Sequence, residues 1–151
     1  MNVFCDPADG YGFEREFCEF AFVDVDRRLR CGRWQGFREE VKRVKKLQNE
    51  FNWDPKRPKT RLAECLFRCV ASGLSRRREE DLCLFVAIGT KLDLAGVDFF
   101  FEFGDRIATF DLTVSQFKKH FRANFLIRRG QFVRDEHYDI GRSIARKLSQ
   151  R

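Results

Sequence analysis

Two aspartates stand in the most apolar part of the chain, where a carboxylate needs a compensating partner. Asp98 precedes a run of three phenylalanines, and Asp111, thirteen residues later, lies between Phe110 and Leu112. Aspartate is depleted from strands, and a buried carboxylate without compensation is costly. A divalent cation supplies that compensation, because Mg²⁺ takes oxygen ligands from one or two carboxylates and keeps positions for phosphate oxygens. The sequence therefore predicts Asp98 and Asp111 as ligands of Mg²⁺ or Mn²⁺, although Asp98 suits the start of a strand equally well.

A third acid, Glu64, lies between Ala63 and Cys65 on a predicted helix and is a candidate ligand for the same metal. It also has Arg61 three positions before it and Arg68 four positions after it, a spacing at which ion pairs form on a helix surface. The surface ion pair is the favoured interpretation of Glu64, and the metal ligand is the alternative.

Segments with helical or strand-like patterns must position these acids. Apolar residues recur every three or four positions over 37–51, which predicts an amphipathic helix. Thr60 is a suitable N-cap for a second helix over 61–74. The further predictions are strands over 17–26, 82–88, 97–103, 106–112 and 124–127, and helices over 115–121 and 136–149.

The order of these elements predicts the fold class. Gly104-Asp105 between two strands is a hairpin signal, so part of the sheet is antiparallel, and a helix between the last two strands suits a crossover. We expect an α/β domain with a mixed, mainly antiparallel four-stranded sheet flanked by helices. Two prolines between Asp54 and Thr60 mark an internal boundary. They divide the chain into an N-terminal extension over 1–59, which begins as a loop, and a core over 60–151.

The arrangement of these acids resembles that of the PD-(D/E)XK nuclease superfamily, which has the restriction-endonuclease-like fold. Glu64 lies on the first helix, Asp98 on the second strand, and Asp111 on the third strand, two residues before the polar Thr113. The resemblance covers residues 60–151 and includes the order of the elements. It implies a metal-dependent nuclease acting on nucleic acid, DNA more than RNA. Asp98 and Asp111 would bind the metal, Glu64 would be an accessory acid, and a metal-activated water would attack the phosphodiester.

The chain departs from the family motif at one position. Two residues after Asp111 the family has a lysine that orients the attacking water, and this chain has Thr113. A hydroxyl supplies no positive charge, so Lys118, Lys119 or Gln116 would have to reach back to the site. Thr113 and Lys118 complete the candidate catalytic set. If no lysine reaches the acids, the alternative is a catalytically inactive nuclease-fold module that binds nucleic acid or a protein partner.

Positive charge is concentrated at the C-terminal end of the chain. Residues 114–151 carry 10 basic and 3 acidic side chains, whereas the rest is balanced, so this segment accounts for the whole net charge of +7. A local excess of this kind attracts polyanions. The residues predicted to hold the phosphates are Lys118, Lys119, Arg122, Arg128 and Arg129.

The remaining features concern location and assembly. The six cysteines include no CxxC pair, which disfavours a zinc ribbon, and we expect reduced thiols in the cytoplasm. The longest apolar runs are too short to span a bilayer, so no membrane partner is expected. A last alternative is a structural or assembly protein of unrelated α/β fold, in which the Phe-rich strands form a core or the interface of a homodimer.

Overall fold

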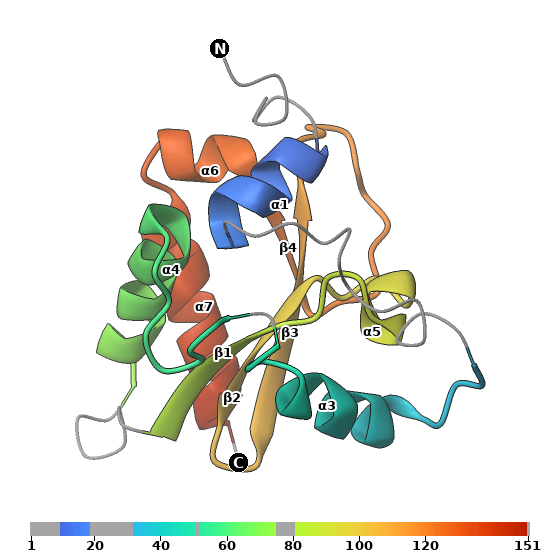
Figure 1. Ribbon diagram of the computed structural model, residues 1–151. Coiled ribbons are helices and arrows are strands. Elements are labelled where there is room, and N and C mark those ends of the chain that lie inside the picture. Colours follow the sequence, from blue (N-terminus) through green and yellow to red (C-terminus); the bar gives the residue numbers. More distant parts are fainter. Residues whose placement is uncertain (1–9, 19–31, 51, 75–80, 151) are drawn as a thin grey trace.

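The computed structural model describes residues 10–18, 32–50, 52–74 and 81–150. Its centre is one four-stranded sheet (Figure 1). The strands, paired in chain order, are β1 (Leu82–Val86), β2 (Phe99–Phe103), β3 (Arg106–Thr113) and β4 (Phe125–Arg128). The first two pairings are antiparallel, and β3 and β4 run parallel. The prediction of a mixed, mainly antiparallel four-stranded sheet flanked by helices is confirmed.

The register between β2 and β3 brings the two aspartates together. Phe99 stands opposite Phe110, so the next position on each strand places Asp98 opposite Asp111. The backbone N–H of Asp98 donates to the Phe110 carbonyl at 3.1 Å. Gly104, with φ of 64°, forms the tight turn between the strands, because glycine adopts positive φ without steric cost.

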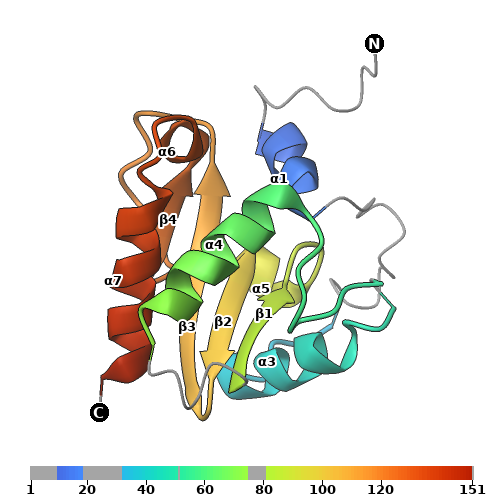
Figure 2. The same ribbon diagram turned by 90° about the vertical axis from the view of Figure 1, so that its left-hand side faces the viewer.

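Three helices cover one face of the sheet, namely α1 (Gly10–Cys18), α4 (Arg61–Ser72) and α7 (His137–Ser149). Figure 2 shows α4 crossing in front of the strands, with α7 beside it and α1 at the upper end. Phe13 and Phe17 of α1 are fully buried. The Phe17 ring makes edge contacts with Phe99 and Phe110, at centroid distances of 4.6 and 5.8 Å, and such pairs add to the stabilisation from burial. Helix α1 is therefore part of the main core, while the division of the chain at 59/60 stays a prediction.

The opposite face packs against α3 (Phe37–Lys46) and α5 (Lys91–Leu94). Phe85 and Phe100 point to this side and stack with their ring centroids 5.2 Å apart. They are buried together with Val41, Val44 and Leu92 from the two helices. On the far edge of the sheet, α6 (Arg129–Val133) connects β4 to α7.

The N-terminal part differs from the prediction. Residues 10–18, expected as a loop and the beginning of a strand, form α1, because Phe13 and Phe17 lie one helical turn apart and both enter the core. The rest of that predicted strand, residues 19–26, lies outside the described residues. The sequence pattern did not predict the short helices α5 and α6. Helices α3, α4 and α7 and the four strands were predicted in the right order, with first or last residues that differ from those in the structure.

The helix predicted over 115–121 was wrong, because this stretch belongs to an irregular loop between β3 and β4. The Thr113 hydroxyl accepts the backbone N–H of Ser115 at 3.1 Å. The guanidinium of Arg128 donates to the carbonyls of Ser115 and Lys118 at 2.5 and 2.7 Å. Side chains thus occupy the backbone groups that a helix would pair internally, which is how Ser and Thr favour turns over helices.

Candidate active site

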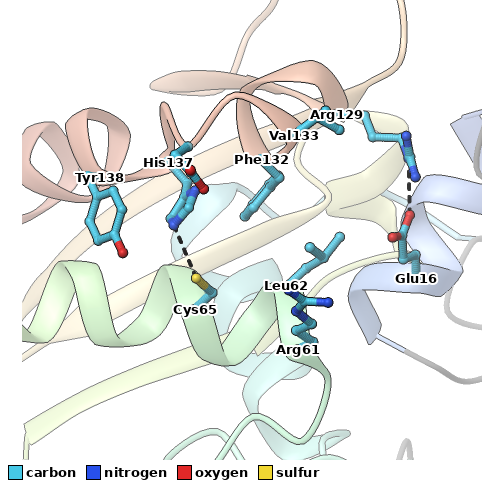
Figure 3. Close-up of a pocket in the computed structure, with 10 residues that line it drawn as sticks. Glu16, Arg61, Leu62, Cys65, Arg129, Phe132, Val133, His137 and Tyr138 are labelled. Carbon is cyan, nitrogen blue, oxygen red and sulfur yellow. Dashed lines mark hydrogen bonds and ion pairs between the residues drawn. The ribbon is translucent and has the colours of Figure 1, made fainter.

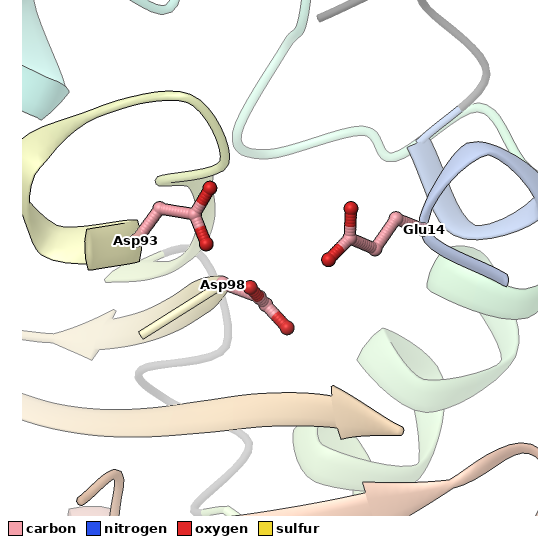
Figure 4. Close-up of side chains that lie close together, drawn as sticks. All are labelled: Glu14, Asp93 and Asp98. Atoms are coloured by element: carbon pink, nitrogen blue, oxygen red, sulfur yellow. The ribbon is translucent and has the colours of Figure 1, made fainter. Parts of the chain in front are cut away.

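Three carboxylates converge at the end of the sheet where β2 begins. Glu14, Asp93 and Asp98 each offer an oxygen that lies within 4.8 Å of the corresponding oxygens of the other two. Figure 4 shows the three side chains pointing toward one another from α1, α5 and the residue just before β2. Asp98 is buried and the other two are partly buried. Acids from three separate parts of the chain therefore share one site.

Local structure fixes the direction of each of these acids. Glu14 follows Phe13, whose burial holds α1 against the sheet. Asp93 accepts the backbone N–H of Gly89 through Oδ2 at 2.8 Å, which orients its carboxylate within the turn that carries α5. Asp98 accepts the backbone N–H of Leu112 through Oδ2 at 2.8 Å, so β3 itself holds this carboxyl group.

Asp111 extends the acidic site and brings a lysine to it. It stands opposite Asp98 when the β2–β3 register is continued by one position, and its Oδ2 lies 2.6 Å from the Nζ of Lys118. The side chain of Asp111 is 11% exposed and that of Lys118 is 37% exposed. Lys118 stands in the β3–β4 loop and reaches back to the strand, so a lysine amine contacts Asp111 even though Thr113 stands where the family has its lysine.

The proximity of the acids changes their acidity. Burial raises the pKa of Asp98 well above its usual range, and the neighbouring carboxyl groups of Asp111, Glu14 and Asp93 raise it further. The pKa of Glu14 rises from 4.5 to about 7, mainly through burial and then through the charges of Asp93 and Asp111. Within the described part of the chain, Lys118 on Asp111 is the ion pair found at this cluster. Asp98 and Glu14 therefore tend to retain their protons, because the surroundings do not neutralise the charges of all the clustered carboxylates.

This donor set suits a divalent cation. All of its ligands are carboxylate oxygens, and hard oxygen ligands are preferred by Mg²⁺ and Mn²⁺, whereas imidazole and thiolate groups favour zinc and copper. Ligands must be deprotonated to bind, so a bound cation would displace the protons that Asp98 and Glu14 otherwise retain.

Glu64 and Thr113 have other hydrogen-bond and ion-pair partners than the acids. Glu64 pairs with Arg68 at 2.5 Å on α4 and is not one of the converging carboxylates in the described structure. The surface ion pair, the favoured interpretation of Glu64, is what is seen. Thr113 is buried and accepts the Ser115 backbone N–H, so its hydroxyl holds the start of the loop that carries Lys118.

The predicted phosphate-binding residues have different environments. Lys119 and Arg122 are exposed on the β3–β4 loop. The stem of Arg122 packs over Gly96, where an added Cβ would lie 3.4 Å from the Arg122 Cβ, and Gly96 lies between α5 and Asp98. Arg122 therefore borders the acidic site. Arg128 is committed to holding the loop. The fifth residue, Arg129, pairs with Glu16 at 3.1 Å.

Sequence reasoning missed Glu14 and Asp93. Glu14 follows several turn-forming dipeptides, which concealed the helix, and the only available signal was the four-residue spacing of Phe13 and Phe17. Asp93 gave no signal, because nothing in its local pattern shows that the turn around it faces α1. Both misses concern contacts between distant segments.

A second polar feature is a cavity of about 440 Å³ lined by α4, α6 and α7 (Figure 3). In its wall the Cys65 Sγ and the His137 Nε2 lie 3.2 Å apart. The His137 ring stacks on Phe132 at a centroid distance of 5.6 Å, and its Nδ1 has no hydrogen-bond partner in the described structure. The ion pair of Arg129 and Glu16 closes another part of the cavity. No spacing in the sequence pointed to this Cys–His pair, whose members are 72 residues apart.

No family model, no curated protein and no solved structure matches this chain. Among the described helices, none has the length and apolar character needed to cross a membrane. The geometry of the acids and of Lys118 is therefore the basis for a functional inference.

Proposed function

We propose that this protein is a metal-dependent nuclease that hydrolyses phosphodiester bonds, with DNA as the preferred nucleic acid. The observation that carries this proposal is the contact of Lys118 with Asp111, 2.6 Å apart, beside the buried Asp98 and the converging Glu14. Metal-dependent phosphodiester hydrolysis requires a group of carboxylates that can hold a cation. It also benefits from a cationic side chain beside them, and Lys118 supplies that side chain here.

Each group has a distinct role in this chemistry. Glu14, Asp93 and Asp98, whose oxygens converge, would hold Mg²⁺ or Mn²⁺ with Asp111 beside them, and the ion when bound would polarise a phosphoryl oxygen and lower the pKa of a water molecule. Lys118 donates hydrogen bonds to the incoming water oxygen or to a phosphate oxygen, and it balances charge that accumulates during attack. The water oxygen bonds to phosphorus and releases a proton to solvent, the phosphorus–oxygen bond to one sugar breaks, and the departing sugar oxygen takes up a proton from solvent.

The resemblance to the PD-(D/E)XK superfamily supports the same proposal. The antiparallel pairing of β2 with β3 brings Asp98 and Asp111 opposite each other, which supports the proposal that they act at one site. Lys118, which contacts Asp111, is our candidate for the role of the motif lysine, and Thr113 holds the start of the loop that carries it. Glu14 on α1 takes the place proposed for Glu64 as the accessory acid.

A cleavage assay tests the proposal. Wild-type protein is incubated with linear duplex DNA, single-stranded DNA and RNA at low salt, with Mg²⁺, Mn²⁺ or EDTA. Glu14→Gln and Asp111→Asn should lose metal-dependent cutting, whereas Glu64→Gln should retain it, because Glu64 pairs with Arg68 away from the acids. Glu64→Gln is a matched control, since it makes the same chemical change on another helix. Absence of cutting by the wild type, or equal loss in Glu64→Gln, would refute the proposed site.

A further inference from the structure

The β3–β4 loop (residues 114–124) is held in place along its whole length. Near its beginning, the carbonyls of Ser115 and Lys118 accept hydrogen bonds from Arg128. At its end, the Asn124 side-chain oxygen accepts the backbone N–H of Thr109 at 3.0 Å, and the Asn124 backbone N–H donates to the Thr109 hydroxyl at 2.9 Å. A segment fixed at both ends and in its middle presents its remaining side chains in a defined arrangement.

Two phenylalanines on this fixed loop are left outside the core. The Phe117 side chain is 84% exposed and that of Phe121 is 43% exposed. An exposed aromatic ring is common by itself, but here the rings alternate with Lys118, Lys119 and Arg122. Ala123, next to the last residue of the loop, is buried in the apolar layer on this side of the sheet. The same loop nevertheless leaves the ring of Phe117 in solvent.

The position of the loop relates these rings to the acids. Figure 1 shows the loop, drawn in orange, passing beside α5 on its way from β3 to β4. Lys118 contacts Asp111, and Arg122 packs over Gly96, two residues before Asp98. Phe117 and Phe121 are thus neighbours in sequence of the two cations that border the acidic site.

We propose that the exposed ring of Phe117 is a stacking subsite for an unpaired nucleobase, so that the substrate of the acidic site is DNA with single-stranded character. Exposed aromatic rings interleaved with cations are the means by which proteins bind single strands, because the rings stack on bases and the cations follow the phosphates. In a duplex the base faces are already stacked on one another and are hidden from such a ring. Phe121, which is less exposed, is a second and weaker platform.

This inference rests on the proposed nuclease only in assuming that the acidic site acts on nucleic acid. The evidence for the stacking subsite itself is the exposure of Phe117 among the cations of the β3–β4 loop. Lys119 and Arg122 attract the phosphates of any nucleic acid, single-stranded or double-stranded. Phe117 adds a contact that only an unpaired base can make. The preference for single strands over duplex should therefore depend on Phe117, while the general affinity depends on the cations.

The test compares binding of a fluorescent oligodeoxythymidylate with binding of a duplex of equal length. Ca²⁺ replaces Mg²⁺, and a denaturing gel verifies that the strands stay intact. Phe117→Ala should weaken single-strand binding by about fivefold or more, in the range of one aromatic–base stack, and should leave duplex binding unchanged. Phe117→Tyr keeps the ring and should bind like the wild type, whereas Phe117→Leu, which keeps only the apolar character, should resemble Phe117→Ala. Tyr138→Ala is the matched control, because it removes a 57% exposed ring from α7.

The outcomes separate this inference from the nuclease proposal. If Phe117→Leu binds like the wild type, or if duplex and single-strand binding fall together in Phe117→Ala, the stacking subsite is refuted even when Mg²⁺-dependent cutting is present. Single-strand binding that depends on Phe117 without any cutting refutes the nuclease and retains the subsite. Wild-type protein that binds neither form of DNA refutes both.

Discussion

Replacing Glu14 with glutamine should stabilise the metal-free protein at high pH and leave it unchanged at low pH. The pKa of Glu14 is raised from 4.5 to about 7 in the folded state. Between these values the unfolded chain has released its proton while the folded protein still holds it. Stability therefore falls as pH rises through this window. Glutamine carries no titrating group, so Glu14→Gln removes this loss.

The magnitude follows from the shift. A pKa that moves from 4.5 to about 7 corresponds to about 3 kcal/mol if the group is fully shielded. Glu14 is only partly buried, and solvent screening reduces the expected effect to about 1–2 kcal/mol. For a domain of this size that equals a rise in Tm of roughly 2–8 °C at pH 8. At pH 4.5 or below the rise should be close to zero.

Thermal unfolding in EDTA at pH 4.5 and pH 8 measures this difference, with Glu64→Gln as the control that should show no pH-dependent gain. Mg²⁺ should reverse the ranking at pH 8, because an ion that binds only the folded wild type raises its Tm, and Glu14→Gln lacks one ligand. A Glu14→Gln variant that is less stable than the wild type at pH 8 in EDTA would refute the electrostatic account of this site. An equal Tm change at both pH values would do the same.

Three further predictions concern catalysis, binding and packing. Lys118→Met should lower the single-turnover cleavage rate by about 10²-fold, whereas Lys119→Met should change mainly the affinity, since Lys119 is exposed without a described contact to the acids. Arg122→Gln should reduce the salt dependence of DNA binding by about one unit of log K against log salt, measured by fluorescence anisotropy. Gly141→Ala would place a methyl group 2.4 Å from the Cys69 Cβ, so urea titration should show a free energy of unfolding about 1–3 kcal/mol lower than that of the wild type. A free energy equal to that of the wild type would mean that α4 and α7 pack less closely than the structure shows.

Much of the sheet could be predicted from the sequence because it depends on short-range patterns. Apolar runs separated by Gly104 define a hairpin, and the spacing of Asp98 and Asp111 follows once that hairpin closes. The helix predicted over 115–121 failed for a reason outside its own residues. Arg128, from the following strand, takes the carbonyls of Ser115 and Lys118 that the helix would have used.

The site could be predicted only in part. Asp98 and Asp111 were predicted because a carboxylate in an apolar strand is conspicuous in any sequence. Lys118 was predicted because Thr113, two residues after Asp111, stands where the family has a lysine. Glu14 carried no such signal, since helix α1 exists through the packing of Phe13 and Phe17 on distant strands. Glu64 had the right residue type on a plausible helix, but its ion pair with Arg68 satisfies it on the surface.

The sequence by itself determined the fold class, the concentration of positive charge in residues 114–151 and the two strand aspartates. Each of these depends on composition or on the repeat of a strand or helix, which are properties of neighbouring residues. Only the tertiary structure decided that Glu14 and Asp93 lie beside Asp98, because this depends on how α1, α5 and β2 meet in space. It also decided that Lys118 contacts Asp111 while Phe117 stays in solvent, since side-chain hydrogen bonds from other elements determine the course of the loop.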